Sequence, residues 1–378
     1  MTPIPDLPTP AALIDVPCMQ HNIARMQQRM EALGVKFRPH VKTSKSLPVV
    51  QAQMAAGARG ITVSTLKEAE QFFAAGIADI LYAVAIAPAK LPQVLQLRRQ
   101  GCDLKIITDS AAGARAIAGF CAEQGEALEA WIEIDVDGHR SGIPPEADAL
   151  LEVGRILHEG GALLGGVMAH AGSSYAHDEP EALRAIAEQE RSGTVRAAER
   201  LRLAGLPCPA VSVGSTPTAL SAVDLHGVTE VRAGVYVFFD LVMHNVGVCA
   251  ASDIALSVLT TVIGHQEEKG WAIVDAGWMA MSGDRGTKQQ KHDFHYGQVC
   301  TETGEPVAGY VLAAANQEHG IVCREQGEVD REIATRFPLG TRLRILPNHA
   351  CATAAQFPEY HAVLAGGEVQ AWPRFYGW

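Results

Sequence analysis

The segment VKFRPHVKTSK, residues 35–45, opens a series of short apolar strands that alternate with longer amphipathic stretches. Three of these stretches, 66–75, 112–124 and 179–204, repeat apolar residues at helical spacing. Such alternation is typical of parallel βα units. The predicted strands up to Gly234 are 35–41, 60–65, 79–84, 104–108, 130–137, 166–170, 210–214 and 229–234. Eight strands over about 200 residues favour a closed (β/α)₈ TIM barrel.

An open, doubly wound α/β sheet is the alternative arrangement of the same elements. That fold usually carries a glycine-rich nucleotide loop after its first strand, and the sequence contains neither GxGxxG nor GxxxxGK[ST]. The barrel is therefore preferred.

The pattern changes after about Ala250, where short strand-like pieces are separated by glycines and helical periodicity is weak. This pattern predicts a mostly antiparallel β domain. We expect a barrel over residues 15–248 and a β domain made of residues 1–14 plus 249–378. TPAALID, residues 9–15, is expected to add a strand to that second domain.

Composition excludes several classes of function. The chain has 378 residues with 31 Lys and Arg against 42 Asp and Glu, so its net charge of −11 argues against nucleic-acid binding. No apolar run reaches the roughly 18–20 residues that a membrane span needs, and no signal peptide is readable. The eight cysteines contain no CxxC pair, which favours buried thiols and a cytoplasmic protein over a disulfide framework.

Functional side chains of a barrel gather where its strands end. Lys42 follows the first strand, where burial would lower its pKa and leave a nucleophilic amine; a solvated loop lysine is the alternative. Arg140 follows the fifth strand and could donate to a phenolate or carboxylate, or form a surface ion pair with Asp135 or Asp137. His170 follows the sixth strand and could contact an aromatic cofactor, or be a core histidine.

The last two strands end in GSTPT (214–218) and RAGVY (232–236). Barrels commonly build a phosphate site in these two loops, from backbone N–H groups and small hydroxyl residues. A simple helix N-cap is the alternative for Gly214, Ser215 and Thr216. The coincidence with a lysine after the first strand favours the phosphate site.

The β domain contains PNHACAT, residues 347–353. If the chain stays extended there, His349 and Cys351 point to the same side and can share a cation. A thiolate ligand favours Zn²⁺, with Mn²⁺ and Co²⁺ as alternatives. Two protein ligands would leave positions for water or substrate. A buried cysteine beside a loop histidine is the other interpretation.

Eight segments together resemble the fold-type III pyridoxal-phosphate enzymes, the family that includes alanine racemase. Within it they are most similar to the branch of D-serine dehydratases, D-threonine aldolases and D-threo-3-hydroxyaspartate dehydratases, and to the last of these in overall texture. The segments are RPHVKTSK, DVDGHRSG, HAGSSY, VGSTPT, EVRAGVYVFFD, DAGWMAMS, NQEHG and PNHACAT. They extend from residue 38 to residue 353, so the resemblance covers essentially the whole chain.

The resemblance implies an alanine racemase-like barrel in which Lys42 carries pyridoxal 5'-phosphate, Arg140 pairs with its O3′ and His170 lies beside its ring. It also implies a divalent metal, Zn or Mn with Co or Mg as alternatives, on His349 and Cys351. Further cofactor contacts implied by the resemblance are Tyr175, Gly214, Ser215, Thr216, Gly234 and Tyr236.

The implied activity is that of a lyase, a dehydratase of small D-3-hydroxy amino acids. D-threo-3-hydroxyaspartate would give oxaloacetate and ammonia, and D-serine would give pyruvate. The alternative is retro-aldol cleavage to glycine and an aldehyde, but D-threonine aldolases usually have an aspartate where this chain has Cys351. A racemase would need a second base, and a non-catalytic carrier of the cofactor would lack the β domain. Members of the family pair as homodimers, with the β domain of one subunit completing the site of the other.

Overall fold

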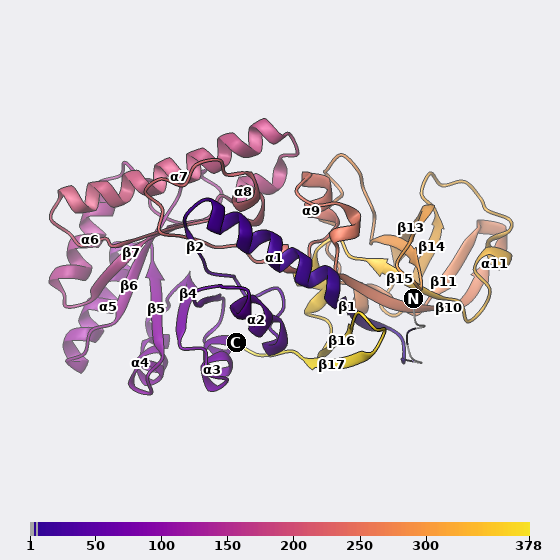
Figure 1. Cartoon of the computed structure of the whole chain (residues 1–378), viewed down its shortest axis with the longest axis horizontal. Helices are drawn as coiled ribbons and strands as arrows, with labels where there is room; N and C mark the ends of the chain where they lie inside the picture. Colours follow the sequence, from indigo (N-terminus) through magenta and orange to yellow (C-terminus); the bar gives the residue numbers. More distant parts are fainter. Residues whose placement is uncertain (1–3, 5–6) are drawn as a thin grey trace. The chain divides into compact units, whose positions relative to one another are not determined.

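The computed structural model describes residue 4 and residues 7–378. Contacts divide the chain into two compact units, coloured along the sequence in Figure 1. The barrel unit contains Ala24–Gly234 and Phe375–Trp378, and the β unit contains the described residues up to Ile23 and Val235–Arg374.

The segment that follows Gly234 groups with the β unit, ahead of the expected boundary after residue 248. Backbone hydrogen bonds explain this grouping. Phe238 O accepts from the N–H of Ala255 at 2.7 Å, and Leu241 N donates to Pro347 O at 3.0 Å.

The barrel unit contains eight parallel strands in the order β2-β9-β8-β7-β6-β5-β4-β3. A parallel bridge between His40 and Thr62 joins the two ends of this order, so the sheet closes on itself. The predicted (β/α)₈ barrel is therefore confirmed. Its strands are β2 (Lys36–Phe37), β3 (Ile61–Val63), β4 (Asp79–Ala85), β5 (Asp103–Thr108), β6 (Glu129–Ile134), β7 (Leu163–Ala169), β8 (Ala210–Val213) and β9 (Glu230–Val231).

Helices lie outside these strands, and local sequence sets where they begin (Figure 1). Thr65 and Glu68 form a capping box at the start of α3, and the Ser110 side chain caps α5. Helix α1 begins in the β unit and ends in the barrel unit. The helices up to Gly234 are α1 (Val16–Ala32), α2 (Leu47–Ala55), α3 (Leu66–Ala74), α4 (Leu91–Arg99), α5 (Ala111–Gln124), α6 (Ala149–Glu159), α7 (Pro180–Leu203) and α8 (Thr216–Ser221).

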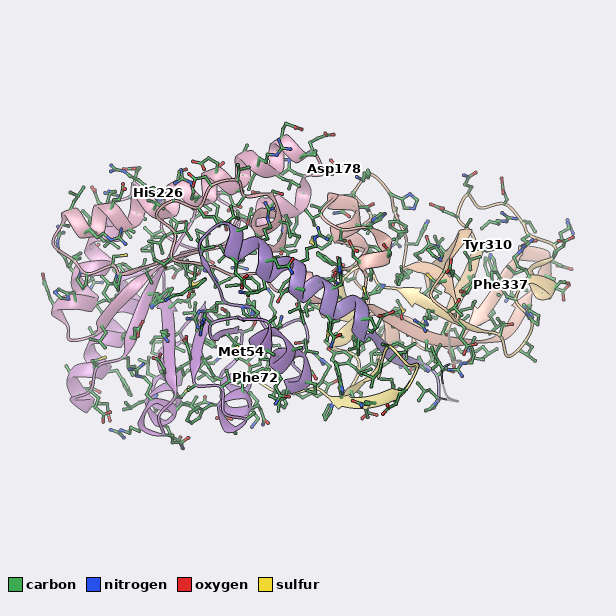
Figure 2. All side chains as sticks on the ribbon, viewed as in Figure 1. Met54, Phe72, Asp178, His226, Tyr310 and Phe337 are labelled. Atoms are coloured by element: carbon green, nitrogen blue, oxygen red, sulfur yellow. The ribbon has the colours of Figure 1, made fainter. Side chains whose placement is uncertain are left out.

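The barrel has an apolar outer layer and a mixed interior, because successive side chains along a strand face opposite ways. Phe72, labelled in Figure 2, belongs to the large outer core, and Met54 packs against that core. The interior contains a smaller apolar cluster of Leu81, Ile107, Trp131 and Met168.

Charged side chains fill the barrel interior near the start of the strands. Arg38 pairs with Asp79 at 2.8 Å and with Glu230 at 2.9 Å, and Lys105 Nζ reaches Asp79 at 2.6 Å. Nearer the other end of the strands, just after β9, Arg232 is 3% exposed and donates to Ser212 Oγ and to the carbonyl oxygen of Ala169, each at 2.5 Å. Charge pairs and hydrogen bonds thus replace apolar packing along part of the barrel axis.

The β unit is built on a nine-stranded sheet in the order β11-β14-β13-β12-β15-β10-β1-β16-β17. All pairings are antiparallel except β1 with β16. This matches the predicted mostly antiparallel domain. Its strands are β1 (Ala11–Asp15), β10 (Leu256–Gln266), β11 (Trp271–Val274), β12 (Gln298–Thr301), β13 (Pro306–Ala315), β14 (Gly320–Arg324), β15 (Arg342–Leu346), β16 (Glu359–Val363) and β17 (Val369–Pro373).

Short helices complete the β unit: α9 (Leu241–Val246), α10 (Trp278–Met281), α11 (Ile333–Arg336) and α12 (Ala350–Ala354). At one end of the sheet the rings of Tyr310 and Phe337, both labelled in Figure 2, meet edge to face with centroids 5.1 Å apart. In the part of the chain that the structure describes, no helix has both the length and the apolar character to cross a bilayer.

Candidate functional site

The C-terminal ends of the barrel strands bring Lys42, Arg140 and His170 together. The positive charges of Lys42, Arg140 and Arg232 all act on the imidazole of His170, which requires the four side chains to lie near one another. Lys42 is exposed, whereas the sequence suggested burial at a strand end. The reason is that Lys42 stands in a turn beyond the strand, where its side chain is open to solvent.

Two histidines below this turn are held in the neutral form. Burial, together with the charges of Lys42 and Arg232, lowers the pKa of His40 well below its usual value. Burial likewise lowers the pKa of His170 to about 4, against an opposing hydrogen bond from its Nδ1 to Gly214 O at 3.0 Å. Tyr175 lies beside His170, with ring centroids 6.1 Å apart.

The depressed pKa of His170 predicts an acid-sensitive fold in the cofactor-free protein. The unfolded chain takes up a proton below pH 6.5, but the folded chain does so only near pH 4. The contribution of neutral His170 to the free energy of unfolding is therefore fully present above pH 6.5. It falls by about 3 kcal/mol as the pH drops from 6.5 to 4. We expect urea unfolding between pH 6.5 and 4 to show a shallower loss of stability in His170→Gln than in the wild type. Equal slopes in the two proteins would contradict this account.

The loops after β8 and β9 approach the rest of the barrel mouth very closely. Gly214 has φ +135°, and a Cβ there would lie 2.1 Å from the carbonyl oxygen of Arg232. A Cβ on Gly234 would lie 3.0 Å from the carbonyl oxygen of His40. Only glycine fits without displacement at the first position, and the second leaves little room, so these loops pack tightly against neighbouring backbone at the barrel mouth.

Ser215 and Thr216 stand at the start of α8. The Ser215 side chain caps this helix through the N–H of Thr218 and also bonds to Ser174 Oγ at 2.9 Å, and Thr216 is the first helical residue. The N-cap interpretation of this loop is thus correct for Ser215. The cap fixes the loop conformation and leaves the phosphate prediction open.

Arg140 and Tyr236 differ from the other predicted cofactor residues. Arg140 is exposed, with 58% of its side chain accessible, and it pairs at 3.4 Å with Glu133, whereas the sequence had suggested Asp135 or Asp137 as partners. Glu133 is the last residue but one of β6. By the alternation of a strand its carboxylate lies on the same side as that of Asp135, two residues later, so it can take the place of Asp135 as a partner. Tyr236 is buried within the β unit, at its first short turn, Val235–Val237.

Sequence reasoning missed two residues of the barrel mouth, His40 and Arg232. Both lie two positions beyond an interior-facing charged residue, Arg38 and Glu230 respectively. Period-two alternation along a barrel strand could have identified them.

The candidate metal site lies in the β unit, around His349 and Cys351. His349 Nδ1 bonds to Asp284 Oδ2 at 2.7 Å, and the imidazole also has a hydrogen bond to Cys351. A carboxylate behind a histidine fixes the ring and leaves the other nitrogen for a metal. Within the described residues, no group of three or more His, Cys, Asp or Glu side chains is arranged to hold a metal.

The sequence prediction of an extended HxC segment is wrong in its local geometry. His349 is extended and forms the N-cap of α12, while Cys351 is already helical. The helix starts here because buried Asp240 accepts the N–H of Ala350 at 2.9 Å, as well as that of Met243 in α9. The turn of the helix, and not strand alternation, brings the thiol next to the imidazole.

The surroundings of His349 determine its protonation. Burial would lower its pKa, but the hydrogen bonds to Asp284 and Cys351 and the charge of Asp240 outweigh it and raise the pKa of His349 to about 11. A metal ion bound to this ring must therefore displace a proton.

Strained backbone marks the same two regions. Four non-glycine residues in the described part of the chain have positive φ: Lys45, Phe239, Ser282 and His295. Lys45 lies three residues after Lys42. Phe239 directly precedes Asp240, and Ser282 lies two residues before Asp284. The carbonyl oxygen of His295 accepts a hydrogen bond from Asn348, the neighbour of His349, at 2.5 Å. Such conformations persist where surrounding structure over-determines them, and they concentrate at functional sites.

Two family models match successive parts of the chain. The family model of the alanine racemase N-terminal domain matches residues 14–242, and a serine dehydratase domain matches residues 255–363. D-threo-3-hydroxyaspartate dehydratase of Delftia sp. (strain HT23) is 71% identical over 98% of both chains. D-serine dehydratase of Dictyostelium discoideum is 29% identical, covering 95% of this chain and 94% of that protein.

Solved structures give the same relationship. The Delftia enzyme superposes with a TM-score of 0.98 at 71% identity, covering 99% of both chains. A cysteine-to-alanine mutant of D-threo-3-hydroxyaspartate dehydratase in the metal-free form superposes with a TM-score of 0.99 at 70% identity over the whole of both chains.

Proposed function

The chain belongs to the alanine racemase N-terminal domain family, in the group with D-threo-3-hydroxyaspartate dehydratase, and from this premise we propose that it converts D-threo-3-hydroxyaspartate to oxaloacetate and ammonia. The observation that carries the proposal is 71% identity over essentially the full length of a relative with that name. D-serine, which would give pyruvate, is the proposed second substrate, supported by the D-serine dehydratase relative.

The residues of the barrel mouth fit pyridoxal phosphate. An exposed lysine amine is available for covalent attachment, neutral His170 offers an aromatic face, and the loops after β8 and β9 would hold the phosphate beside the start of α8. Arg140 would donate to the phenolate oxygen, with Tyr175 nearby. When bound, the cofactor supplies an electron sink that stabilises negative charge at the substrate α-carbon.

Lys42 has two roles in this proposal. It would hold the cofactor between turnovers, and its Nζ, when free, would take the substrate α-proton as a general base. Burial and three nearby cations lower the pKa of His170 to about 4, so its imidazole would be only a weak base. The base at the barrel mouth is therefore the amine and not the imidazole.

The β unit supplies the donor set for a divalent metal, His349 and Cys351. A held cation would act as a Lewis acid toward the departing β-hydroxyl group. Asp284 orients the imidazole and Asp240 holds the start of α12, so both support the ligand pair. Zn²⁺ or Mn²⁺ is the proposed metal, since a thiolate and an imidazole suit Zn²⁺ well.

We further propose that the barrel unit is the cofactor domain and that the β unit carries the metal. The enzyme would be a homodimer in which the β unit of one copy completes the barrel site of the other, as the family resemblance implies. None of the eight cysteines is in a disulfide, which supports a reducing, cytoplasmic setting.

A product assay tests the reaction. Purified holoenzyme is incubated with D-threo-3-hydroxyaspartate, D-serine and D-threonine, with and without a chelator, and oxo acid plus ammonia is measured against glycine plus aldehyde. We expect oxaloacetate from the first substrate, pyruvate more slowly from the second, and loss of both on chelation. Glycine as the product would identify an aldolase and overturn the proposal. An enzyme that releases as much oxo acid after complete removal of its metal as before would overturn the role of the metal.

A further inference from the structure

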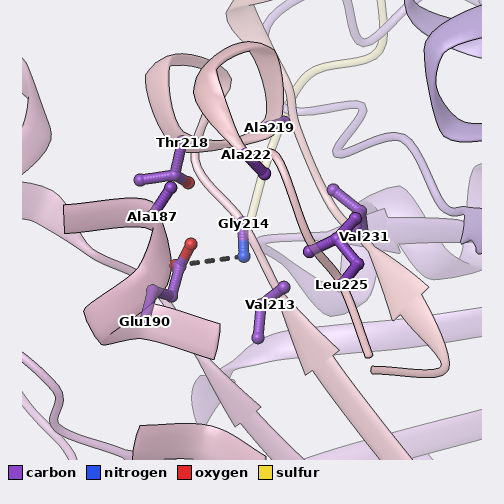
Figure 3. Close-up of a pocket in the computed structure, with 9 residues that line it drawn as sticks. All are labelled: Ala187, Glu190, Val213, Gly214, Thr218, Ala219, Ala222, Leu225 and Val231. Atoms are coloured by element: carbon purple, nitrogen blue, oxygen red, sulfur yellow. Dashed lines mark hydrogen bonds between the residues drawn. The ribbon is translucent and has the colours of Figure 1, made fainter. Parts of the chain in front are cut away.

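One buried acid on the outer helix layer reaches into the loops of the candidate cofactor site. Glu190 is in the middle of α7 and is 1% exposed. Its Oε1 accepts the N–H of Ala171 at 2.8 Å and the N–H of Gly214 at 3.0 Å, the second of which is drawn in Figure 3. A single oxygen thus joins the loops that follow β7 and β8.

These two loops carry several of the predicted cofactor residues. Ala171 directly follows His170, and Gly214 directly precedes Ser215 and Thr216. His170 Nδ1 also bonds to Gly214 O at 3.0 Å. The loops are therefore tied together twice, once directly and once through Glu190.

Glu190 also reaches the first turn of α8. Its carboxylate has a hydrogen bond to the Thr218 side chain, and Thr218 Oγ1 accepts the N–H of Ser215 at 2.9 Å. The acid thereby acts on both sides of the GST segment, residues 214–216. It bonds to Gly214 at the start of the segment and to Thr218, two residues beyond its end.

The surroundings of Glu190 offer little replacement for these bonds. A small cavity beside it is lined mainly by apolar side chains, among them Ala187, Val213, Leu225 and Val231 (Figure 3). Loss of the carboxylate would leave two buried N–H groups without an acceptor, and such groups are costly unless the backbone moves to find one. Movement of Ala171 or Gly214 would shift His170 or the GST segment with it.

We infer that Glu190 is a positioning residue, which holds the loops after β7 and β8 in the relative geometry that binds the cofactor without touching the cofactor itself. The inference rests on the proposed function, because it takes these loops to bind pyridoxal phosphate. What must be preserved is an acceptor oxygen at the position of Oε1, so the shape of the side chain matters more than its charge.

A set of variants on one helix tests this. Cofactor-free wild type, Glu190→Ala, Glu190→Asp and Glu190→Gln are titrated with pyridoxal phosphate by absorbance, with thermal unfolding of each protein alongside. We expect the Ala and Asp variants to bind at least about tenfold more weakly, since the shorter Asp carboxylate cannot reach both N–H groups. Glu190→Gln keeps an acceptor oxygen and should remain within about threefold of the wild type.

Arg200→Met is the matched control on the same helix. Arg200 bonds to the carbonyl oxygens of Pro145 at 2.5 Å and Ala147 at 3.0 Å, just before the start of α6 and outside the loops that follow β7 and β8. It should lower the melting temperature and leave cofactor affinity unchanged.

The outcomes separate the inference from the function beneath it. If Glu190→Ala does not fold, Glu190→Asp decides the matter. Wild-type affinity in the folded Asp variant would overturn the inference, as would affinity losses that follow the melting temperature across all variants, Arg200→Met included. Failure of the wild type itself to bind pyridoxal phosphate would refute the proposed function first, and the inference with it.

Discussion

Lys42→Ala should lose at least about 10³-fold in kcat, because the variant lacks both the attachment point of the cofactor and the base that takes the α-proton. It should also lose the covalent link itself. After treatment of the wild type with borohydride and pyridoxal phosphate, peptide mass spectrometry should find the label on the peptide that contains Lys42, and Lys42→Ala should remain unlabelled.

Lys45 provides the control, because it is the other lysine of the same loop. Its Nζ is 3.8 Å from Glu68 and lies 5.6 Å from the centre of the Trp378 ring, so it is engaged away from the barrel mouth. Lys45→Arg should retain the label and most of the activity. Labelling of Lys42→Ala at Lys45 would show that the attachment point had been assigned to the wrong lysine.

Removal of either metal ligand should have the second large effect. His349→Ala and Cys351→Ala should lose bound divalent metal and about 10²–10³-fold of kcat, since a Lewis acid contributes several kcal/mol to the departure of a poor leaving group. The yellow colour of the bound cofactor should remain, because His349 and Cys351 belong to the β unit and the proposed cofactor residues Lys42 and His170 to the barrel unit. Elemental analysis, absorbance and oxo acid release measure the three properties separately.

Cys323→Ala is the matched cysteine control. Cys323 is in β14, and its thiol is 3.5 Å from the carbonyl oxygen of Arg324. It belongs to the same unit as Cys351 but to a different element, since Cys351 is in α12. It should keep metal content and turnover. A His349→Ala enzyme that retained metal and full β-elimination would refute the metal assignment.

The barrel could be predicted from the sequence because its signal is local. Most of the strands are short apolar runs bounded by turns, and each of the helices α3, α5 and α7 shows its periodicity within one segment. The division between the units is harder, because it depends on which distant backbone groups pair. Phe238 and Leu241 follow the last barrel strand within ten residues. Only their backbone hydrogen bonds to Ala255 and Pro347 reveal that they belong to the β unit.

The candidate site was predictable in part for the same reason. Lys42, His170 and the GST segment all follow strands, and strand ends can be read from the sequence. The interactions of Glu190 and Asp284 could not be, because each acts across a long separation in the chain: Glu190 on Gly214, and Asp284 on His349. The exposure of Lys42 and the helical start at Ala350 depend on how a turn leaves its strand, which composition does not encode.

Strand β1 has a consequence for the order in which the chain can assemble. Ile14 pairs with Leu256 and with Ala362, so its two neighbours are made more than 240 residues after it. At synthesis rates of roughly 5–20 residues per second, an apolar strand with both edges open waits about 12–50 s on the ribosome for its first partner. All eight strands of the barrel emerge within that interval. Nascent β1 is therefore an open strand edge at which two growing chains can aggregate unless a chaperone covers it.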